Sequence, residues 1–200
     1  MNGYIGPDGQ TRCKWAGSAP EFLEYHDQEW GFPVSNDVRL FEKLCLEAFQ
    51  SGLSWRTILN KRDGFRAAFD GFDFHKAARY DATDMDRLLN DENIVRHRGK
   101  IAAVVNNAAR ALEMIDEDGS LAAFFWRFEP KLAELGPPQT QSTSTTSIAL
   151  ARELKRRGWK FLGPTTIFAF MQAMGLINDH SENCTMRAAV DDARRNFQRP

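Results

Sequence analysis

The stretch DVRLFEKLCLEAFQSGLSW, residues 37–55, decides the fold of this chain. Its apolar residues recur at steps of three and four, which predicts a helix buried along one broad face. Gly52 ends this predicted helix, and Ser54 is placed to cap a second helix that begins at Trp55. Glu47 falls within the apolar register, where a carboxylate is costly to desolvate unless it is paired. The sequence therefore singles out Glu47 as a candidate site residue.

Length and composition are those of an ordinary globular protein. The chain has 200 residues, 42% hydrophobic and 26% charged, which suffices for one core in one domain or two small lobes. A formal net charge of −1 means that any DNA-binding surface must be confined to one face. No apolar run has the length of a membrane span and the N-terminus lacks the features of a signal peptide, so we expect no membrane association and a cytoplasmic location.

Helical periodicity recurs along the rest of the chain, and no window shows the sustained alternation of a strand. We therefore expect an all-α fold of short helices, with a longer helix at about 100–115 and another that begins at Pro164. Residues 1–11 and 185–200 are expected to be loose tails. The PPQTQSTSTT run within 130–146 has the composition of an exposed loop, and the sequence assigns no role to residues 137–146.

Two pairs of cysteine and histidine lie near the two ends of the chain. Twelve residues separate Cys13 from His26, and His180 and Cys184 follow the pattern His-x3-Cys. Cys2His2 is a closed tetrahedral donor set suited to a structural Zn²⁺, which would tie the chain ends together. The spacing alone leaves a second interpretation open, in which the cysteines are buried thiols and the histidines are ordinary core or surface residues.

The segment GWKFLG, residues 158–163, is a predicted hairpin between two helices with basic residues on its flanks. Glycines let the backbone approach a phosphate closely, and the amides at the next helix's N-terminus carry a positive dipole. This geometry suits sequence-independent contact with a DNA backbone. A solvated basic turn is the alternative, and RHRGK at 96–100 is a second basic turn with the same two interpretations.

Short motifs along the chain together resemble one enzyme family. In chain order they are CxWA (13–16), YHDxEWG (25–31), LFExLCLE (40–47), QxGLSW (50–55), IVRHRGKI (94–101), KFLGPTT (160–166), FMQAMGLINDH (170–180) and Cys184. From about residue 12 to 184 the chain resembles the bacterial DNA-3-methyladenine glycosylase I family, within the helix-hairpin-helix glycosylase superfamily.

The resemblance implies an all-helical, two-lobed fold with a helix-hairpin-helix element, in one glycosylase unit that spans residues 1–200. It implies three sets of site residues. The ligands of a structural zinc are Cys13, His26, His180 and Cys184. The residues at the DNA backbone are Gly158, Lys160, Gly163 and Thr165. The base-binding residues are Trp15, Tyr25, Glu47 and Trp55.

The implied function is base-excision repair by hydrolysis of the N-glycosidic bond of 3-methyladenine in alkylated double-stranded DNA, after the base has flipped out. Methylation at N3 makes the base cationic, which suits indole faces and a carboxylate. Trp55 is the expected stacking platform with Trp15 as a second wall, and Tyr25 adds a polar contact. Glu47 is the expected catalytic residue, through recognition and electrostatics.

The same resemblance implies that Asp179 supports the adjacent zinc ligand, His180, and does not act as a catalytic base. No organic cofactor is expected, and the protein is expected to be a monomer.

Other interpretations remain open. The chain could be a non-catalytic, zinc-containing helical DNA-binding module, or a glycosylase of the same fold for 7-methylguanine or an oxidised base. A zinc hydrolase is disfavoured because protein would fill all four coordination positions. From the residues alone, Glu47 could also be a structural carboxylate paired with an arginine, and the tryptophans could be core. Trp30, Trp126 and Trp159 are expected to serve in packing only.

Overall fold

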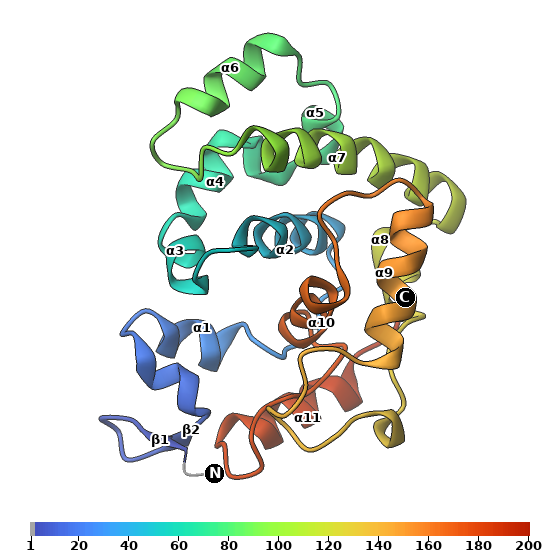
Figure 1. The fold of residues 1–200 in the computed structure, drawn as a ribbon. Coiled ribbons are helices and arrows are strands. Elements are labelled where there is room, and N and C mark those ends of the chain that lie inside the picture. Colours follow the sequence, from blue (N-terminus) through green and yellow to red (C-terminus); the bar gives the residue numbers. More distant parts are fainter. Residues whose placement is uncertain (1–2) are drawn as a thin grey trace.

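Helices make up most of the described chain, residues 3–200, in a computed structural model of the protein (Figure 1). The α-helices are α1 (Phe22–Gln28), α2 (Asp37–Gln50), α3 (Trp55–Asn60), α4 (Arg62–Ala68), α5 (Phe74–Ala77), α6 (Ala82–Asn90), α7 (Arg98–Asp118), α8 (Leu121–Trp126), α9 (Thr145–Arg156), α10 (Pro164–Ala173) and α11 (Met186–Asn196). The 3-10 helices are η1 (Lys14–Ser18), η2 (Asp70–Phe72) and η3 (Leu132–Glu134). The strands are β1 (Tyr4–Ile5) and β2 (Thr11–Arg12). The expected helical fold class is confirmed, apart from this short pair of strands.

Helix α2 begins and ends where the sequence predicts. The Asn36 side chain accepts a hydrogen bond from the Arg39 amide and so caps its first turn. The Ser54 side chain accepts from the Thr57 amide, which starts α3 at Trp55 as expected. The positive φ of 79° at Gly52 provides the turn between the two helices.

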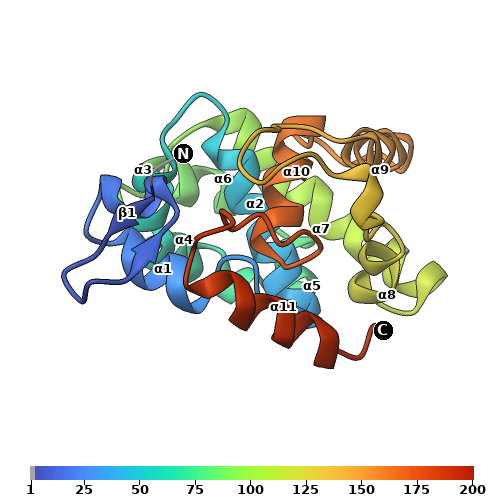
Figure 2. The same ribbon diagram turned by 90° about the horizontal axis from the view of Figure 1, so that it is seen from below.

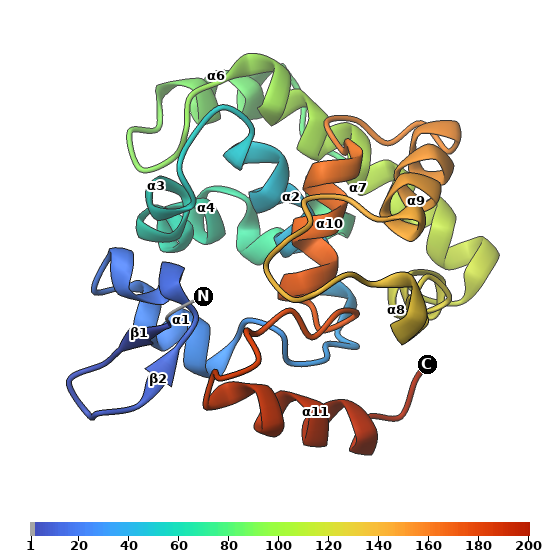
Figure 3. The ribbon, with the colours of Figure 1, turned by 60° about the horizontal axis from the view of Figure 1, so that its bottom comes forward.

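The packing around α2 is tighter than a one-faced helix requires. Every residue from Lys43 to Phe49 is buried. Helices α7, α8 and α10 all contact α2, which lies in the middle of the molecule in Figures 1 and 3. The predicted single broad face is therefore too narrow for the second half of α2, because neighbours cover this half all round.

One cation of the RHRGK turn serves the fold. The ammonium of Lys100, on α7, donates to the carbonyl oxygens of Phe49 (2.9 Å) and Ser51 (2.5 Å) at the end of α2. These carbonyls have no partner within the helix, so the buried lysine satisfies them and complements the helix dipole. Arg96 and Arg98 remain exposed.

The segment that leads into α11 lies beside the β1–β2 strand pair, so residues far apart in the sequence meet there (Figures 2 and 3). Strands β1 and β2 pair antiparallel, and the Thr185 amide donates to the Thr11 carbonyl at 2.9 Å. The structure thus corrects two expectations: a short strand pair is present, and the segments 1–11 and 185–200 are not loose throughout, since the second contains α11. Met1 and Asn2 of the first segment lie outside the described residues.

The segment between α8 and α9 is irregular, as expected, with η3 as its only regular element among the described residues. Helix α10 has Pro164 in its first turn, also as expected. None of the described helices is both long and apolar enough for a membrane span.

Gly175 joins α10 to the segment that leads to the second histidine–cysteine pair. Its φ is 80°, and a Cβ there would lie 2.5 Å from the backbone nitrogen of Pro33. We expect Gly175→Ala to lower the free energy of unfolding by about 3 kcal/mol, because backbone strain adds to a contact that only backbone movement can relieve. Urea denaturation measures this difference.

Gly119→Ala is the matched control. Gly119 has a φ of 87°, and a Cβ at this position would meet no atom within 4 Å, so its variant carries the φ strain alone, about 1 kcal/mol. Equal destabilisation of the two variants would contradict the argument from Pro33.

Candidate active site and metal centre

A buried ion pair lies within α2. Glu47 and Lys43 are each only 5% exposed, and the Lys43 ammonium lies 3.0 Å from Oε1 of Glu47. The two residues are one helical turn apart, so both side chains project to the same side of α2. Pairing offsets part of the cost of desolvating each charge. The structural alternative for Glu47 named an arginine as its partner, but here the partner is a lysine that the sequence analysis did not single out.

The Lys43 ammonium also contacts two aromatic residues. It donates to the Tyr25 hydroxyl at 2.6 Å and lies 3.6 Å from the centroid of the Trp55 ring, a cation–π contact. Burial lowers the pKa of Lys43, and the charge of Glu47 acts against this. Burial together with the charge of Glu47 raises the pKa of Tyr25 well above its usual value, so the phenol is neutral.

The four predicted base-binding residues line one cavity of about 280 Å³. Trp15 comes from η1, Tyr25 from α1, Glu47 from α2 and Trp55 from α3. The Tyr25 and Trp55 rings are tilted neighbours with centroids 5.3 Å apart. We call this space the aromatic cavity. The indole nitrogen of Trp55 is buried and has no hydrogen-bond partner among the described residues.

Further residues line the aromatic cavity that the sequence analysis missed. They are Phe22, Trp30, Gln50, Gln139, Ala169 and Gln172. The expectation that Trp30 serves in packing only is incomplete, because its ring also meets Trp15 edge-on at the cavity, with centroids 5.1 Å apart. Gln50 stands three residues after Glu47 and could have been found from helical spacing. Gln139 lies in the irregular segment, where no periodicity could have indicated it.

Asp179 orients two of these glutamines. Its carboxylate accepts from the Gln172 side-chain amide at 2.6 Å and from the Gln139 backbone amide at 3.1 Å, and the Gln139 side chain donates to its carbonyl. Burial raises the pKa of Asp179. Asp179 was expected to support the metal ligand beside it, but among the described residues no hydrogen bond joins its carboxylate to His180. The carboxylate instead fixes the amides at the aromatic cavity.

The four predicted metal ligands meet in one buried cluster. The ligand atoms of Cys13, His26, His180 and Cys184 all lie within 4.8 Å of one another. The sulfur of Cys184 lies 3.6 Å from Nε2 of His26 and 3.4 Å from Nδ1 of His180, and the sulfur of Cys13 lies 3.6 Å from the same Nδ1. Tetrahedral Zn²⁺ with its usual Zn–S and Zn–N distances places adjacent ligand atoms about 3.6 Å apart. The residues present therefore fit the ion.

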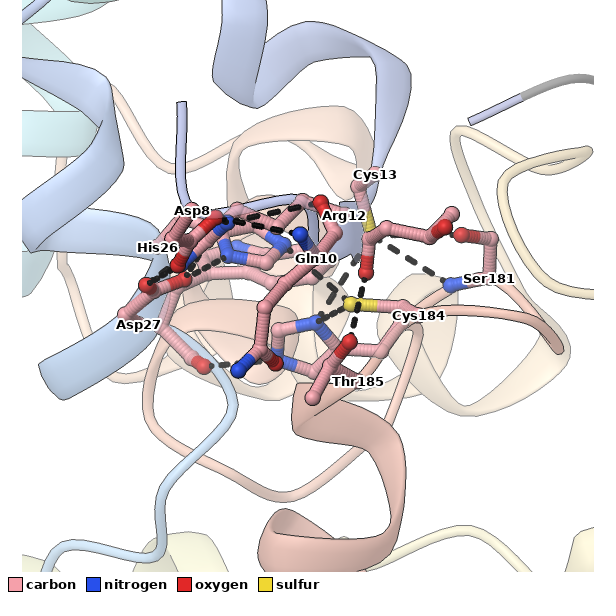
Figure 4. A network of polar contacts seen from close by, with 12 residues as sticks. Asp8, Gln10, Arg12, Cys13, His26, Asp27, Ser181, Cys184 and Thr185 are labelled. Atoms are coloured by element: carbon pink, nitrogen blue, oxygen red, sulfur yellow. Dashed lines mark hydrogen bonds and ion pairs between the residues drawn. The ribbon is translucent and has the colours of Figure 1, made fainter. Parts of the chain in front are cut away.

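Acceptors behind the two histidines set their tautomers (Figure 4). Nε2 of His180 donates to the Trp30 carbonyl at 3.0 Å, and Nδ1 of His26 donates to the Asp27 carboxylate at 2.7 Å. The nitrogens left as acceptors are the two that face the sulfurs, which is the arrangement of metal-binding histidines. Arg12 holds Asp27 in turn, with Nε 2.9 Å from its carboxylate.

The surroundings of the cluster favour a thiolate on Cys184, whereas the hydrogen bond with Cys184 and burial raise the pKa of Cys13. Burial would raise the pKa of Asp27, but hydrogen bonds from Arg12 and His26 lower it overall, so the carboxylate is ionised. The pKa of Cys184 is lowered, chiefly by a hydrogen bond from Cys13 and further by the two histidines. A cysteine binds a metal as its thiolate.

The connection between α9 and α10 is held firmly by α7. The side chain of Asn107 accepts from the Lys160 amide at 2.8 Å and donates to the Lys160 carbonyl at 3.0 Å, and Asn106 donates to the Gly158 carbonyl at 2.9 Å. Gly158 has a φ of 82°, which its lack of a side chain permits. Trp159 is buried beneath the turn.

The four residues predicted to face DNA are exposed at this connection. They are Gly158, Lys160, Gly163 and Thr165. Phe161, between them, is 44% exposed and its ring lies 6.3 Å from that of His97, the residue that caps α7. This contact places the two basic turns beside each other.

The fold and site define a class of protein: a mostly helical protein whose aromatic-walled cavity, with a buried carboxylate, suits a planar, electron-poor ring. Residues 15–188 match the methyladenine glycosylase family. The chain is 44% identical to DNA-3-methyladenine glycosylase 1 of Escherichia coli (strain K12) over 177 residues, 86% of this chain and 95% of that protein. The chain belongs to the methyladenine glycosylase family.

Solved structures agree with this assignment. A crystal structure of 3-methyladenine DNA glycosylase I is similar, with a TM-score of 0.81 at 42% identity over 88% of this chain and 98% of that one. A structure that shows 3-methyladenine recognition by 3-methyladenine DNA glycosylase I of Staphylococcus aureus has a TM-score of 0.81 at 37% identity, over 86% of this chain and 94% of that one.

Proposed function

We propose that this protein is a base-excision repair glycosylase that hydrolyses the N-glycosidic bond of 3-methyladenine in alkylated double-stranded DNA. The observation that carries the proposal is the aromatic cavity, where Trp15, Tyr25, Glu47 and Trp55 meet. The names of the relatives, which are 3-methyladenine glycosylases, support the same reaction.

The reaction begins with a base outside the helix. Flipping costs a few kcal/mol and is cheapest for a damaged base. Methylation at N3 leaves adenine cationic while it is still joined to the sugar. The base stacks on Trp55, with Trp15 as a second wall, and gains cation–π attraction that a neutral base lacks. The unpaired Trp55 indole nitrogen can donate a hydrogen bond to a ligand in the aromatic cavity.

Glu47 contributes recognition and electrostatics. Its carboxylate can accept hydrogen bonds from the exocyclic amine, and its charge favours a cation. Since the methylated base is already an activated leaving group, no side chain needs to protonate it. Water adds to C1′ of the sugar and releases one proton to solvent, the bond from C1′ to the base nitrogen breaks with its electron pair, and the base leaves neutral.

The amides at the cavity add edge recognition. Gln139 and Gln172 each offer both donors and acceptors to a base edge. Asp179 fixes their orientation, so that a base with the wrong edge would cover an amide without pairing it.

The Cys2His2 cluster is proposed to hold a structural Zn²⁺. Four protein ligands leave no open coordination position, so the ion supplies a cross-link and not a reactive water. The four ligands would hold η1 and α1 against the segment before α11. Cys13 and His26 come from the N-terminal end of the chain, and His180 and Cys184 come from the C-terminal end.

The exposed connection between α9 and α10 is proposed to be the hairpin of a helix-hairpin-helix element that grips the DNA backbone. Gly158, Lys160, Gly163 and Thr165 lie where a phosphate can approach them. We further propose that the protein acts in the cytoplasm as a monomer without an organic cofactor.

A non-catalytic DNA-binding module is the second candidate that the test must separate. Chromatography of free bases released from methylated duplex DNA, with 3-methyladenine and 7-methylguanine followed together, makes the distinction. We expect selective release of 3-methyladenine. Release of 7-methylguanine instead would assign a different base, and DNA binding without release of any base would favour the module.

Glu47→Gln tests the charge at the cavity. We expect base release to fall by about 100-fold or more, since a neutral amide loses the attraction for the cationic base. Single-turnover assays on methylated DNA measure the loss. The matched control is Glu42→Gln on the same helix, because Glu42 pairs with Arg66 outside the aromatic cavity. Full activity in Glu47→Gln would show that the charge is not used.

Cys184→Ser tests the metal. We expect about one zinc ion per chain in the wild type, little in the variant, and a free energy of unfolding lower by about 3 kcal/mol or more. Metal analysis and denaturation measure the two effects. Cys45→Ser is the control, because Cys45 is equally buried but lies outside the cluster. Equal zinc in wild type and Cys184→Ser would refute the ligand assignment.

Lys160→Gln tests the DNA surface. A lysine at a phosphate releases about one counterion, so we expect the slope of log affinity against log salt to become shallower by about one. Titration of duplex DNA at several salt concentrations measures the slope. Lys131→Gln, an exposed lysine before η3, should leave it unchanged. The same slope in Lys160→Gln and wild type would remove Lys160 from the DNA surface.

A further inference from the structure

Lys43 lies behind the wall of the aromatic cavity and does not line it. Lys43 lines a second hollow, and Tyr25 and Trp55 line this second hollow as well. These two aromatic residues therefore form the wall between the two spaces. A base in the aromatic cavity would therefore interact with Lys43 through these two aromatic residues and through Glu47.

The contacts of the Lys43 ammonium all reach residues of the aromatic cavity. It lies 3.0 Å from Oε1 of Glu47, 2.6 Å from the Tyr25 hydroxyl and 3.6 Å from the Trp55 ring centroid. The ammonium thus contacts the carboxylate, the hydroxyl and the aromatic ring of three residues that line one cavity, which indicates a role at this cavity beyond packing in the core.

The two other carboxylates that line the second hollow, those of Glu29 and Glu42, are already paired with arginines. Arg62 lies 2.7 Å from Glu29, and Arg66 lies 2.9 Å from Glu42. Arg39 also lines the second hollow. The carboxylate that pairs with the Lys43 ammonium is therefore Glu47, and the two form a unit whose formal charges cancel.

The first consequence concerns the attraction for a cationic base. Adding the 3.6 Å from the ammonium to the Trp55 centroid to a stacking separation of about 3.5 Å puts a stacked base about 7 Å from the ammonium. At an effective dielectric constant of about 20, repulsion between unit charges at that distance changes a binding constant by tenfold or more. Lys43 thus offsets much of the attraction that Glu47 exerts.

The second consequence concerns the stacking face. A cation on one face of an indole draws its π density, so the opposite face attracts a second cation less strongly. Stacking of a neutral ring of the same shape loses much less. Both effects of Lys43 therefore weaken the preference of the aromatic cavity for a cationic base over a neutral one.

We propose that Lys43 is a specificity-determining residue, whose ammonium limits the preference of the aromatic cavity for cationic over neutral bases. Lys43 also stabilises the protein, because it keeps the Glu47 carboxylate paired when the cavity is empty or holds the neutral product. A lone buried charge would be strongly destabilising in these states. This inference rests on the proposed function of the cavity as a base-binding site.

Two small probes test the proposal without DNA. The first is 3,9-dimethyladeninium, a cation at pH 7, and the second is neutral 9-methyladenine, which lacks only the N3 methyl group and its charge. Calorimetric titration gives the ratio of their affinities for each variant at pH 7. We expect Lys43→Met to raise the preference for the cation at least tenfold over wild type. Lys43→Arg, which keeps the charge, should stay within about threefold.

Two further variants guard the interpretation. Lys43→Met combined with Glu47→Gln removes both charges, and its preference should fall back to within a few-fold of wild type. Lys61→Met is the matched control, because the Lys61 ammonium bonds to the Glu92 carbonyl away from the cavity. Lys43→Gln replaces Lys43→Met if the latter does not fold.

The outcomes separate the inference from the proposed function. An unchanged or lowered preference for the cation in Lys43→Met would overturn the role of Lys43 while leaving the base site intact. Failure of wild type to bind either probe would overturn the base-binding function itself, and the inference with it.

Discussion

The burial of one ion pair inside α2 is the constraint on which the rest of the site depends. Lys43 and Glu47 are both nearly inaccessible, and a protein interior tolerates such charges only in contact with each other and with further polar or π partners. Tyr25 and Trp55 supply these partners. The arrangement that makes the carboxylate tolerable thereby also builds two walls of the cavity beside it.

The Cys2His2 cluster and the aromatic cavity are mechanically one structure. Tyr25 precedes His26 on α1, and the carbonyl of Trp30 accepts from His180 while its ring lines the cavity. The proposed cross-link between the two ends of the chain would therefore fix the two aromatic walls that come from its N-terminal end. A metal ion with four protein ligands would in this way support base recognition without taking part in the reaction.

Local patterns predicted those parts of the structure that depend on neighbours along the chain. The bounds of α2, the cap at Ser54 and the first turn of α10 followed from periodicity, side-chain hydrogen bonds and proline geometry. The ligand set and the residues of the cavity required motifs in fixed order, since spacing alone left Cys13 and Cys184 open to another interpretation. The sequence predicted loose tails because local patterns contain no information about contacts between distant segments. The tails are ordered by such contacts, for example that of Thr185 with Thr11.

The sequence by itself determined the helical class, the central place of α2 and the family, because apolar periodicity and ordered motifs are properties of the chain alone. Only the tertiary structure decided which polar groups meet. The partner of Glu47 is Lys43, Gln139 reaches the cavity through Asp179, and Trp30 joins the metal cluster to the cavity. The physical reason is that a buried charge or amide is satisfied by whatever donor or acceptor folding brings within about 3 Å, and that choice is made in space.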